Sequence, residues 1–138
     1  MTQKEKKEQL LRDLSARLPY RVVVDYAHNA FALHKGHYLK SGTKNILTCY
    51  LLDVFISPRQ NEEGEYIKPY LFPLSSMTEE QKVIYGDLCY DVIRSSPENT
   101  QSKLNELYDW LNKNYMDYRG LIPMGMAIDA TGLNIYRL

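Results

Sequence analysis

Three histidines lie close together in the first third of the chain, and imidazole is the side chain here that most readily suggests a metal. His34 and His37 are three residues apart, and His28 precedes them. A spacing of three on a strand or turn does not bring both rings to one face. No cysteine or cluster of carboxylates nearby completes a ligand set. We therefore expect solvated histidines, with no metal and no cofactor.

Patterns that would indicate a serine nucleophile or a phosphate-binding loop do not occur in the sequence. Ser75 and Ser76 precede a predicted helix, where serine is expected as a cap. No serine lies in a Gly-x-Ser-x-Gly sequence, and there is neither a Walker-type nor a dinucleotide-binding glycine pattern. These observations favour a protein that is not an enzyme.

Carboxylates for acid–base chemistry are present but do not form a recognisable set. The spacing of Asp109, Asp117 and Asp129 indicates no site that they share with Arg119. Residues 117–120, Asp-Tyr-Arg-Gly, are typical of a structured loop in which the Asp and the Arg form an ion pair.

The same loop is a candidate contact for a protein partner. The residues concerned are Trp110, Asp117, Tyr118 and Arg119. Exposure of the loop at residues 109–125 would favour a partner site, whereas burial would make it part of the scaffold.

Positive charge gathers in the front of the chain, which suggests nucleic acid as an alternative partner. Residues 1–44 hold nine Lys and Arg against four Asp and Glu, and the remainder holds eight against thirteen. Cations beside aromatic rings are suited to binding single strands on a sheet. The candidate contacts are Arg21, Lys35, Lys40, Lys44, Tyr26 and Tyr38, with Tyr20 and Phe31 nearby. No RNA-recognition fingerprint is present, and five of the nine cations fall on one predicted helix, where a solvated face also explains them.

The elements that would position these residues begin with a helix over residues 3–18, capped by Thr2 and stopped by Pro19. Residues 20–26 predict a strand rich in β-branched and aromatic side chains, and residues 30–34 and 38–39 predict weaker strands. Residues 45–57 are apolar on both faces, which predicts a central strand covered on both sides. Residues 65–72 predict its partner at the sheet edge, because Pro69 lacks an amide donor.

Helices dominate the second half. Two overlapping helix-start signals, Ser76 with Glu79 and Thr78 with Gln81, precede a predicted helix over residues 78–94. A second helix is predicted over residues 100–115. Glycines and a proline then favour a loop-rich tail, with a last strand at residues 134–137.

Composition is that of one globular domain, residues 1–138: a helix to residue 19, a β-rich front to residue 74 and a helical back. No apolar run is long enough to span a membrane and no secretory signal is evident. Cys49 and Cys89 lack metal-site spacing, and we expect reduced thiols in a cytoplasmic protein, with a disulfide between them as the alternative.

Two blocks of sequence resemble a known family. Residues 68–80 read Lys-Pro-Tyr-Leu-Phe-Pro-Leu-Ser-Ser-Met-Thr-Glu-Glu; residues 109–112 read Asp-Trp-Leu-Asn and residues 117–122 read Asp-Tyr-Arg-Gly-Leu-Ile. They are similar to motifs of small uncharacterised proteins encoded in prophages and mobile elements of gut Bacteroides-type bacteria. The resemblance covers residues 65–138 better than the β-rich front. It implies no activity, so no catalytic residue is transferred.

The chain also departs from that family's pattern. Relatives often have Arg at the position of Phe72 and a histidine pair at Asn114 and Tyr115. A shared chemical role of these positions is therefore in doubt, and a packing motif explains the blocks better.

These inferences lead to one expected fold and three expected functions. The fold is α+β: an N-terminal helix, a mainly antiparallel sheet of four or five strands, then two helices packed on the sheet. The first function is a non-enzymatic accessory protein of a mobile element that binds a protein partner. The alternatives are nucleic-acid binding through the basic front, and an enzyme of unrecognised type. Neither the oligomeric state nor the partner follows from the sequence.

Overall fold

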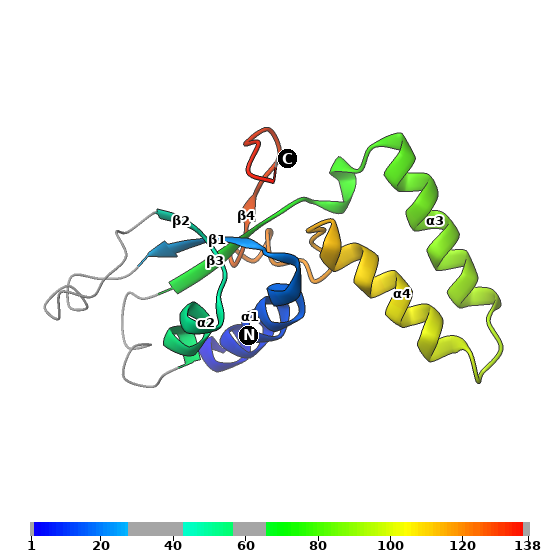
Figure 1. The fold of residues 1–138 in the computed structure, drawn as a ribbon, viewed down its shortest axis with the longest axis horizontal. Helices are drawn as coiled ribbons and strands as arrows, with labels where there is room; N and C mark the ends of the chain where they lie inside the picture. The colour runs from blue at the N-terminus through cyan, green and yellow to red at the C-terminus, as the bar shows by residue number, and fades with distance from the viewer. Residues whose placement is uncertain (1, 28–42, 57–65, 137–138) are drawn as a thin grey trace, which may run out of the picture.

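A computed structural model describes residues 2–27, 43–56 and 66–136, and it has the predicted α+β architecture (Figure 1). Within these described ranges the sheet has four strands in the order β2-β1-β3-β4. Strand β1 (Val23–Ala27) runs antiparallel to both β2 (Thr43–Ile46) and β3 (Tyr66–Leu71), and β4 (Ile128–Asp129) runs parallel to β3. The predicted mainly antiparallel sheet is therefore confirmed.

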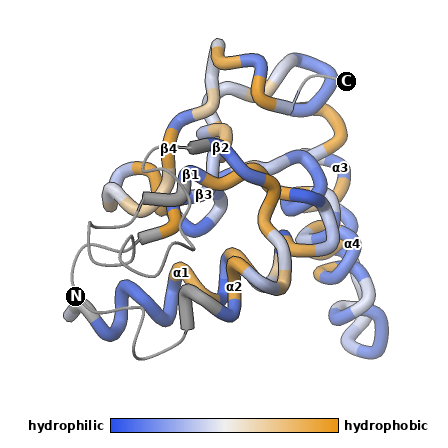
Figure 2. Tube along the Cα trace, turned by 60° about the vertical axis from the view of Figure 1, so that its left-hand side comes forward, coloured by the Kyte–Doolittle hydropathy of each residue, from blue (hydrophilic) through white to orange (hydrophobic). Residues whose placement is uncertain are grey.

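Helix α1 (Gln3–Arg17) forms as predicted. The Thr2 side chain accepts a hydrogen bond from the Glu5 backbone N–H while the Glu5 side chain accepts one from the Thr2 N–H, so a capping box starts the helix. Figure 2 shows hydrophilic residues at its start and hydrophobic residues in its second half. There Leu10 and Leu14 are buried. The apolar stripe thus fixes which side of α1 enters the core.

The prediction of a central strand over residues 45–57 is wrong. Pairing with β1 stops at Ile46, and the chain then turns into helix α2 (Cys49–Ile56). The Thr48 hydroxyl accepts a hydrogen bond from the Leu51 N–H at 3.2 Å, which starts the helix. Leu47 and Leu51, four residues apart, are both buried. A continuous apolar run satisfies strand and helix periodicity equally, and the cap decides for the helix.

Strand β3 lies inside the sheet, which corrects the prediction that Pro69 marks an edge. Its partners are β1 and β4 rather than residues 45–57. The Leu71 carbonyl accepts a hydrogen bond from Ala130, and alternate residues of a strand turn their polar groups to the same side, so the Pro69 nitrogen also faces β4. Strand β4 pairs only with Tyr70 and Leu71, so the missing donor at Pro69 breaks no ladder bond.

Helices α3 (Glu79–Arg94) and α4 (Thr100–Lys113) form a hairpin that extends from the sheet (Figure 1). The Thr78–Gln81 capping box is confirmed, whereas the Ser76 hydroxyl donates to the Pro73 carbonyl instead of capping the helix. The sequence predicts that both helices pack on the sheet. In the structure α3 packs against α4, and α4 in turn contacts α1.

The buried apolar side chains of the described residues form two hydrophobic clusters. The larger joins α1, the strands, α2 and the chain after α4; its fully buried members include Leu14, Val22, Val24, Leu71 and Leu121. The smaller lies at the base of the hairpin and contains Met77, Leu107, Leu111 and Met116. No residue of α3 is buried, so α3 is covered least of the long helices.

The tail is loop-rich, as predicted, but its last strand lies earlier than predicted. Gly120, Gly125 and Gly132 have φ of 72°, 74° and 78°, values that end any helix there. The described strand is β4 at residues 128–129, and residues 134–136 form none.

Candidate interaction site

Asp117, in the candidate partner loop, is buried and holds its own loop together. Its carboxylate accepts hydrogen bonds from the backbone N–H groups of Leu121 at 2.8 Å and Ile122 at 2.9 Å. The ion pair that the sequence suggests with Arg119 is replaced by these contacts. Asp117 therefore fixes the turn that leads the chain back to the core.

Arg119 pairs with Asp13 of α1 and not with Asp117. Its Nη1 atom donates to Asp13 Oδ1 at 3.0 Å. The other oxygen of Asp13 accepts from Arg17 Nε at 2.9 Å, and Arg17 Nη2 donates to the Met116 carbonyl at 2.6 Å. Asp13 and Arg17 have no solvent exposure. One buried carboxylate thus joins two guanidinium groups and ties α1 to the chain after α4.

Tyr118 completes this buried network. The guanidinium carbons of Arg17 and Arg119 lie 5.2 and 4.8 Å from its ring centroid, within cation–π range. Its hydroxyl donates to Asn112 Oδ1 at 2.8 Å and accepts from Arg119 at 3.0 Å. Among the described residues only Arg17 Nη1 is a buried side-chain polar atom without a partner. We interpret the network as a scaffold, because its polar groups bind one another.

One sequence signal could have revealed this network. Asp13 and Arg17 are four residues apart and alternate with Leu10 and Leu14 on the apolar side of α1. A charged pair at helical spacing on an apolar stripe needs a buried partner. Arg119 supplies part of that partner from 106 residues away in the sequence.

Trp110, the remaining residue of the candidate partner loop, belongs to the helical hairpin. Its ring stacks on Tyr85 of α3, with centroids 6.2 Å apart and an interplanar angle of 26°. Trp110 therefore links the two helices. The pKa of the Tyr85 hydroxyl is raised, mainly by burial.

The basic front falls only partly within the described residues. Arg21 is exposed, with a left-handed φ of 59°, and Lys44 is exposed on β2, with its Nζ atom 5.9 Å from the Tyr70 ring centroid. Tyr26 lies on β1. Lys35, Lys40 and Tyr38 lie outside the described residues, as do His28, His34 and His37. Nucleic-acid binding stays a prediction.

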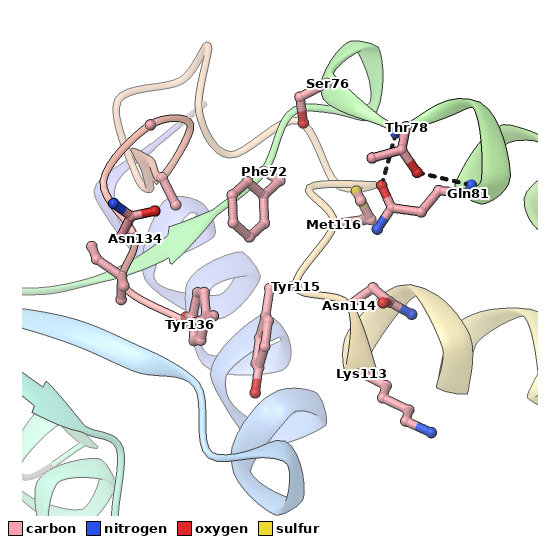
Figure 3. Close-up of a pocket in the computed structure, with 13 residues that line it drawn as sticks. Phe72, Ser76, Thr78, Gln81, Lys113, Asn114, Tyr115, Met116, Asn134 and Tyr136 are labelled. Atoms are coloured by element: carbon pink, nitrogen blue, oxygen red, sulfur yellow. Dashed lines mark hydrogen bonds between the residues drawn. The ribbon is translucent and has the colours of Figure 1, made fainter. Parts of the chain in front are cut away.

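A groove of about 480 Å³ lies where β3, the base of the hairpin and the tail meet (Figure 3). Its wall contains the rings of Tyr115 and Tyr136, stacked with centroids 3.6 Å apart, and Phe72 beside them. The Tyr115 hydroxyl donates to the Tyr20 carbonyl at 2.5 Å. Lys113, Asn114 and Asn134 lie at its rim. The Tyr115 hydroxyl thus serves the fold, and the groove is lined by both aromatic rings and polar side chains.

Tyr136 closes a gap in the sheet. Its hydroxyl accepts from the Val23 N–H and donates to the Tyr70 carbonyl, both at 2.8 Å, next to the last β1–β3 pair, Val24 with Pro69. Burial raises the pKa of this hydroxyl far above its ordinary value. The neutral form is therefore part of the folded structure.

Large apolar side chains lie exposed on the outward side of α3. Val83, Tyr90 and Ile93 are 63%, 55% and 79% exposed. With Gly86 they recur at spacings of three, four and three, which places them on one side of the helix. The opposite side, with Tyr85, Leu88, Cys89 and Val92, packs towards α4. We call Val83, Gly86, Tyr90 and Ile93 the outer stripe.

Other kinds of site find no support in the described parts of the chain. They contain no group of three or more His, Cys, Asp or Glu side chains that could hold a metal ion. No helix among them is long and apolar enough to cross a membrane. Cys49 is exposed, Cys89 is partly buried, and both are free thiols, so the alternative of a disulfide is not realised.

Comparisons of this chain with models of protein families, with curated protein sequences and with solved structures found no match. The outer stripe is the candidate site that the geometry favours.

Proposed function

We propose that this protein is a non-enzymatic interaction protein that binds a protein partner through the outer stripe of α3. The observation that carries the proposal is the exposure of Val83, Tyr90 and Ile93 at helical spacing on a helix with no buried residue. Apolar anchors on one side of a helix are the pattern by which a helix enters a groove or packs on another helix. Water contact at all three side chains is unfavourable, and a partner would relieve it.

Two of the polar residues considered for catalysis are engaged within the fold. Asp117 is occupied by the backbone of its own loop, and Arg119 by Asp13 and Tyr118. Groups held in this way are not free to exchange protons with a substrate. The resemblance of residues 68–80 and 109–122 to proteins of prophages and mobile elements adds a setting: an accessory protein in the bacterial cytoplasm.

Photo-cross-linking tests the proposal at the stripe itself. A benzophenone amino acid placed at Tyr90 should, on irradiation in a lysate of a Bacteroides-type bacterium, form covalent adducts with a protein that mass spectrometry identifies. The matched control places the same group at Asn105, which is exposed on α4. Adducts from position 90 but not from position 105 support the proposal. No adduct from position 90, or equal adducts from both positions, would contradict it.

A further inference from the structure

We propose that the partner of the outer stripe is a second copy of this chain, bound through its own α3 in an antiparallel, two-fold symmetric pair. This inference rests on the proposed function, because it names the occupant of the same surface. A two-fold interface uses one patch on both copies, so the patch must be complementary to itself. The outer stripe has this property in size and in part of its charge.

Side-chain size is complementary in one register. Gly86 lies three residues after Val83, and Tyr90 lies three residues before Ile93. When two α3 helices are antiparallel, one alignment therefore places Val83 opposite Ile93 of the second copy and Gly86 opposite its Tyr90. The smallest residue of the stripe then faces the largest, and the symmetry repeats the match.

Gly86 is the residue that the fold of one chain does not explain. It lies inside a 16-residue helix, where glycine is less favourable than alanine. A Cβ atom added there would meet nothing within 4 Å, so no neighbour in the chain requires its absence. Across the antiparallel pair the missing side chain leaves room for the Tyr90 ring of the second copy.

Charges beside the stripe favour the same register at its ends. Arg94 lies against Tyr90: its Nη1 atom donates to the Tyr90 hydroxyl at 2.5 Å and its guanidinium carbon is 5.2 Å from the ring centroid. In the antiparallel pair Arg94 comes beside Glu80 of the second copy, twice by symmetry. Asp87 lies near Asp87 of the second copy, close to the two-fold axis, and the two carboxylates repel each other. Asp87→Asn should therefore lower the dissociation constant of the pair.

Sedimentation velocity of the full chain under reducing conditions, from about 5 to about 500 µM, tests the pairing. A single helix pair is smaller than a standard interface, so we expect micromolar association. Gly86→Leu should raise the dissociation constant about thirtyfold or more while raising the melting temperature of the monomer, since leucine is the better helix former. The control Glu106→Leu adds the same side chain on α4, where Glu106 is exposed, and should leave association unchanged.

A second variant tests the register. Combining Gly86→Leu with Tyr90→Ala moves the large side chain to the other side of the contact and should recover most of the association. A wild-type chain that stays monomeric throughout the range, or one whose association is equal in wild type and Gly86→Leu, would overturn the inference. Failure to recover association in the double variant would overturn the register. If the chain is monomeric while position 90 still cross-links to another protein, the proposed function stands and the second copy is excluded.

Discussion

The loop after α4 and helix α3 place their side chains in opposite environments. In the loop, Asp117 and Arg119 are charged groups of the kind that bind ligands, yet hydrogen bonds within the fold engage both. On α3, Val83 and Ile93 are apolar groups of the kind that fill cores, yet water reaches most of their surface. Residue type by itself would assign the two regions the wrong way round.

This contrast separates stability from binding. Buried charges that satisfy one another are strongly destabilising to break, because the remaining partner is left unpaired in the interior. Exposed apolar groups contribute little to the fold and are free to serve a partner. We therefore expect changes in the buried network to lower the free energy of unfolding, and changes on the outer stripe to alter association.

The largest expected effect is that of Asp13→Ala, which would leave Arg17 and Arg119 without their shared carboxylate. We expect a loss of about 3–5 kcal/mol in the free energy of unfolding, measured by urea denaturation. Glu8→Ala, an exposed position of the same helix, is the control and should change the value by less than about 0.5 kcal/mol. A loss at Asp13 no larger than at Glu8 would break the comparison, because the network would then not hold α1 to the chain after α4.

Tyr136→Phe should have the next largest effect. It removes the hydroxyl that joins Val23 to Tyr70, so the Val23 N–H loses this partner and the free energy of unfolding should fall by about 1–3 kcal/mol. The folded-state pKa of Tyr136 is raised by burial, so its contribution is present below the unfolded value of about 10 and is lost as pH rises above it. Unfolding free energies measured between neutral and alkaline pH should therefore fall less steeply in the variant. Tyr108→Phe, on an exposed ring, is the control and should leave the unfolding free energy at neutral pH unchanged.

Thr78→Ala tests the start of α3. The Thr78 hydroxyl accepts from the Gln81 N–H at 3.1 Å, so its removal should lower stability by about 1 kcal/mol. Amide hydrogen exchange should rise at the first turn of α3 and remain unchanged in α1, whose own cap is intact. Equal increases in both helices would mean that α1 and the α3–α4 hairpin unfold together.

Gly86→Ala should act in the opposite direction. Because nothing surrounds the added methyl group, only helix propensity changes, and the monomer should gain about 1 kcal/mol in thermal or urea unfolding. A loss of stability would show that some part of the chain already fills the space beside Gly86.

Sequence reasoning succeeded where local hydrogen bonding determines the structure. Thr2 and Thr78 each form a capping box with a residue only three positions later, and both helices begin where these residues indicate. The strand prediction for residues 45–57 was wrong because their apolar run fits both the strand period and the helix period. The contact that favours the helix is the hydrogen bond that the Thr48 hydroxyl accepts. The prediction that Pro69 marks an edge strand was wrong because its place in the sheet depends on the length of β4, which lies far along the chain.

The candidate site was only partly predictable for a related reason. Periodicity identifies the apolar residues of α3 but does not say which of them a neighbour covers. Ile93 follows Val92 directly and is equally apolar, yet Val92 packs towards α4 and Ile93 is 79% exposed. The buried position of Asp13 was not predictable from the solvated face expected for this helix, because its partner Arg119 is remote in sequence.

The most direct test of the contrast is the free energy of unfolding of Val83→Ser/Tyr90→Ser/Ile93→Ser, measured at a concentration where the chain is monomeric. If the outer stripe is a binding surface that the fold does not need, the variant should unfold within about 1 kcal/mol of the wild type. A loss of about 3 kcal/mol or more would show that these side chains pack inside the fold, and would contradict the assignment of the outer stripe to a partner.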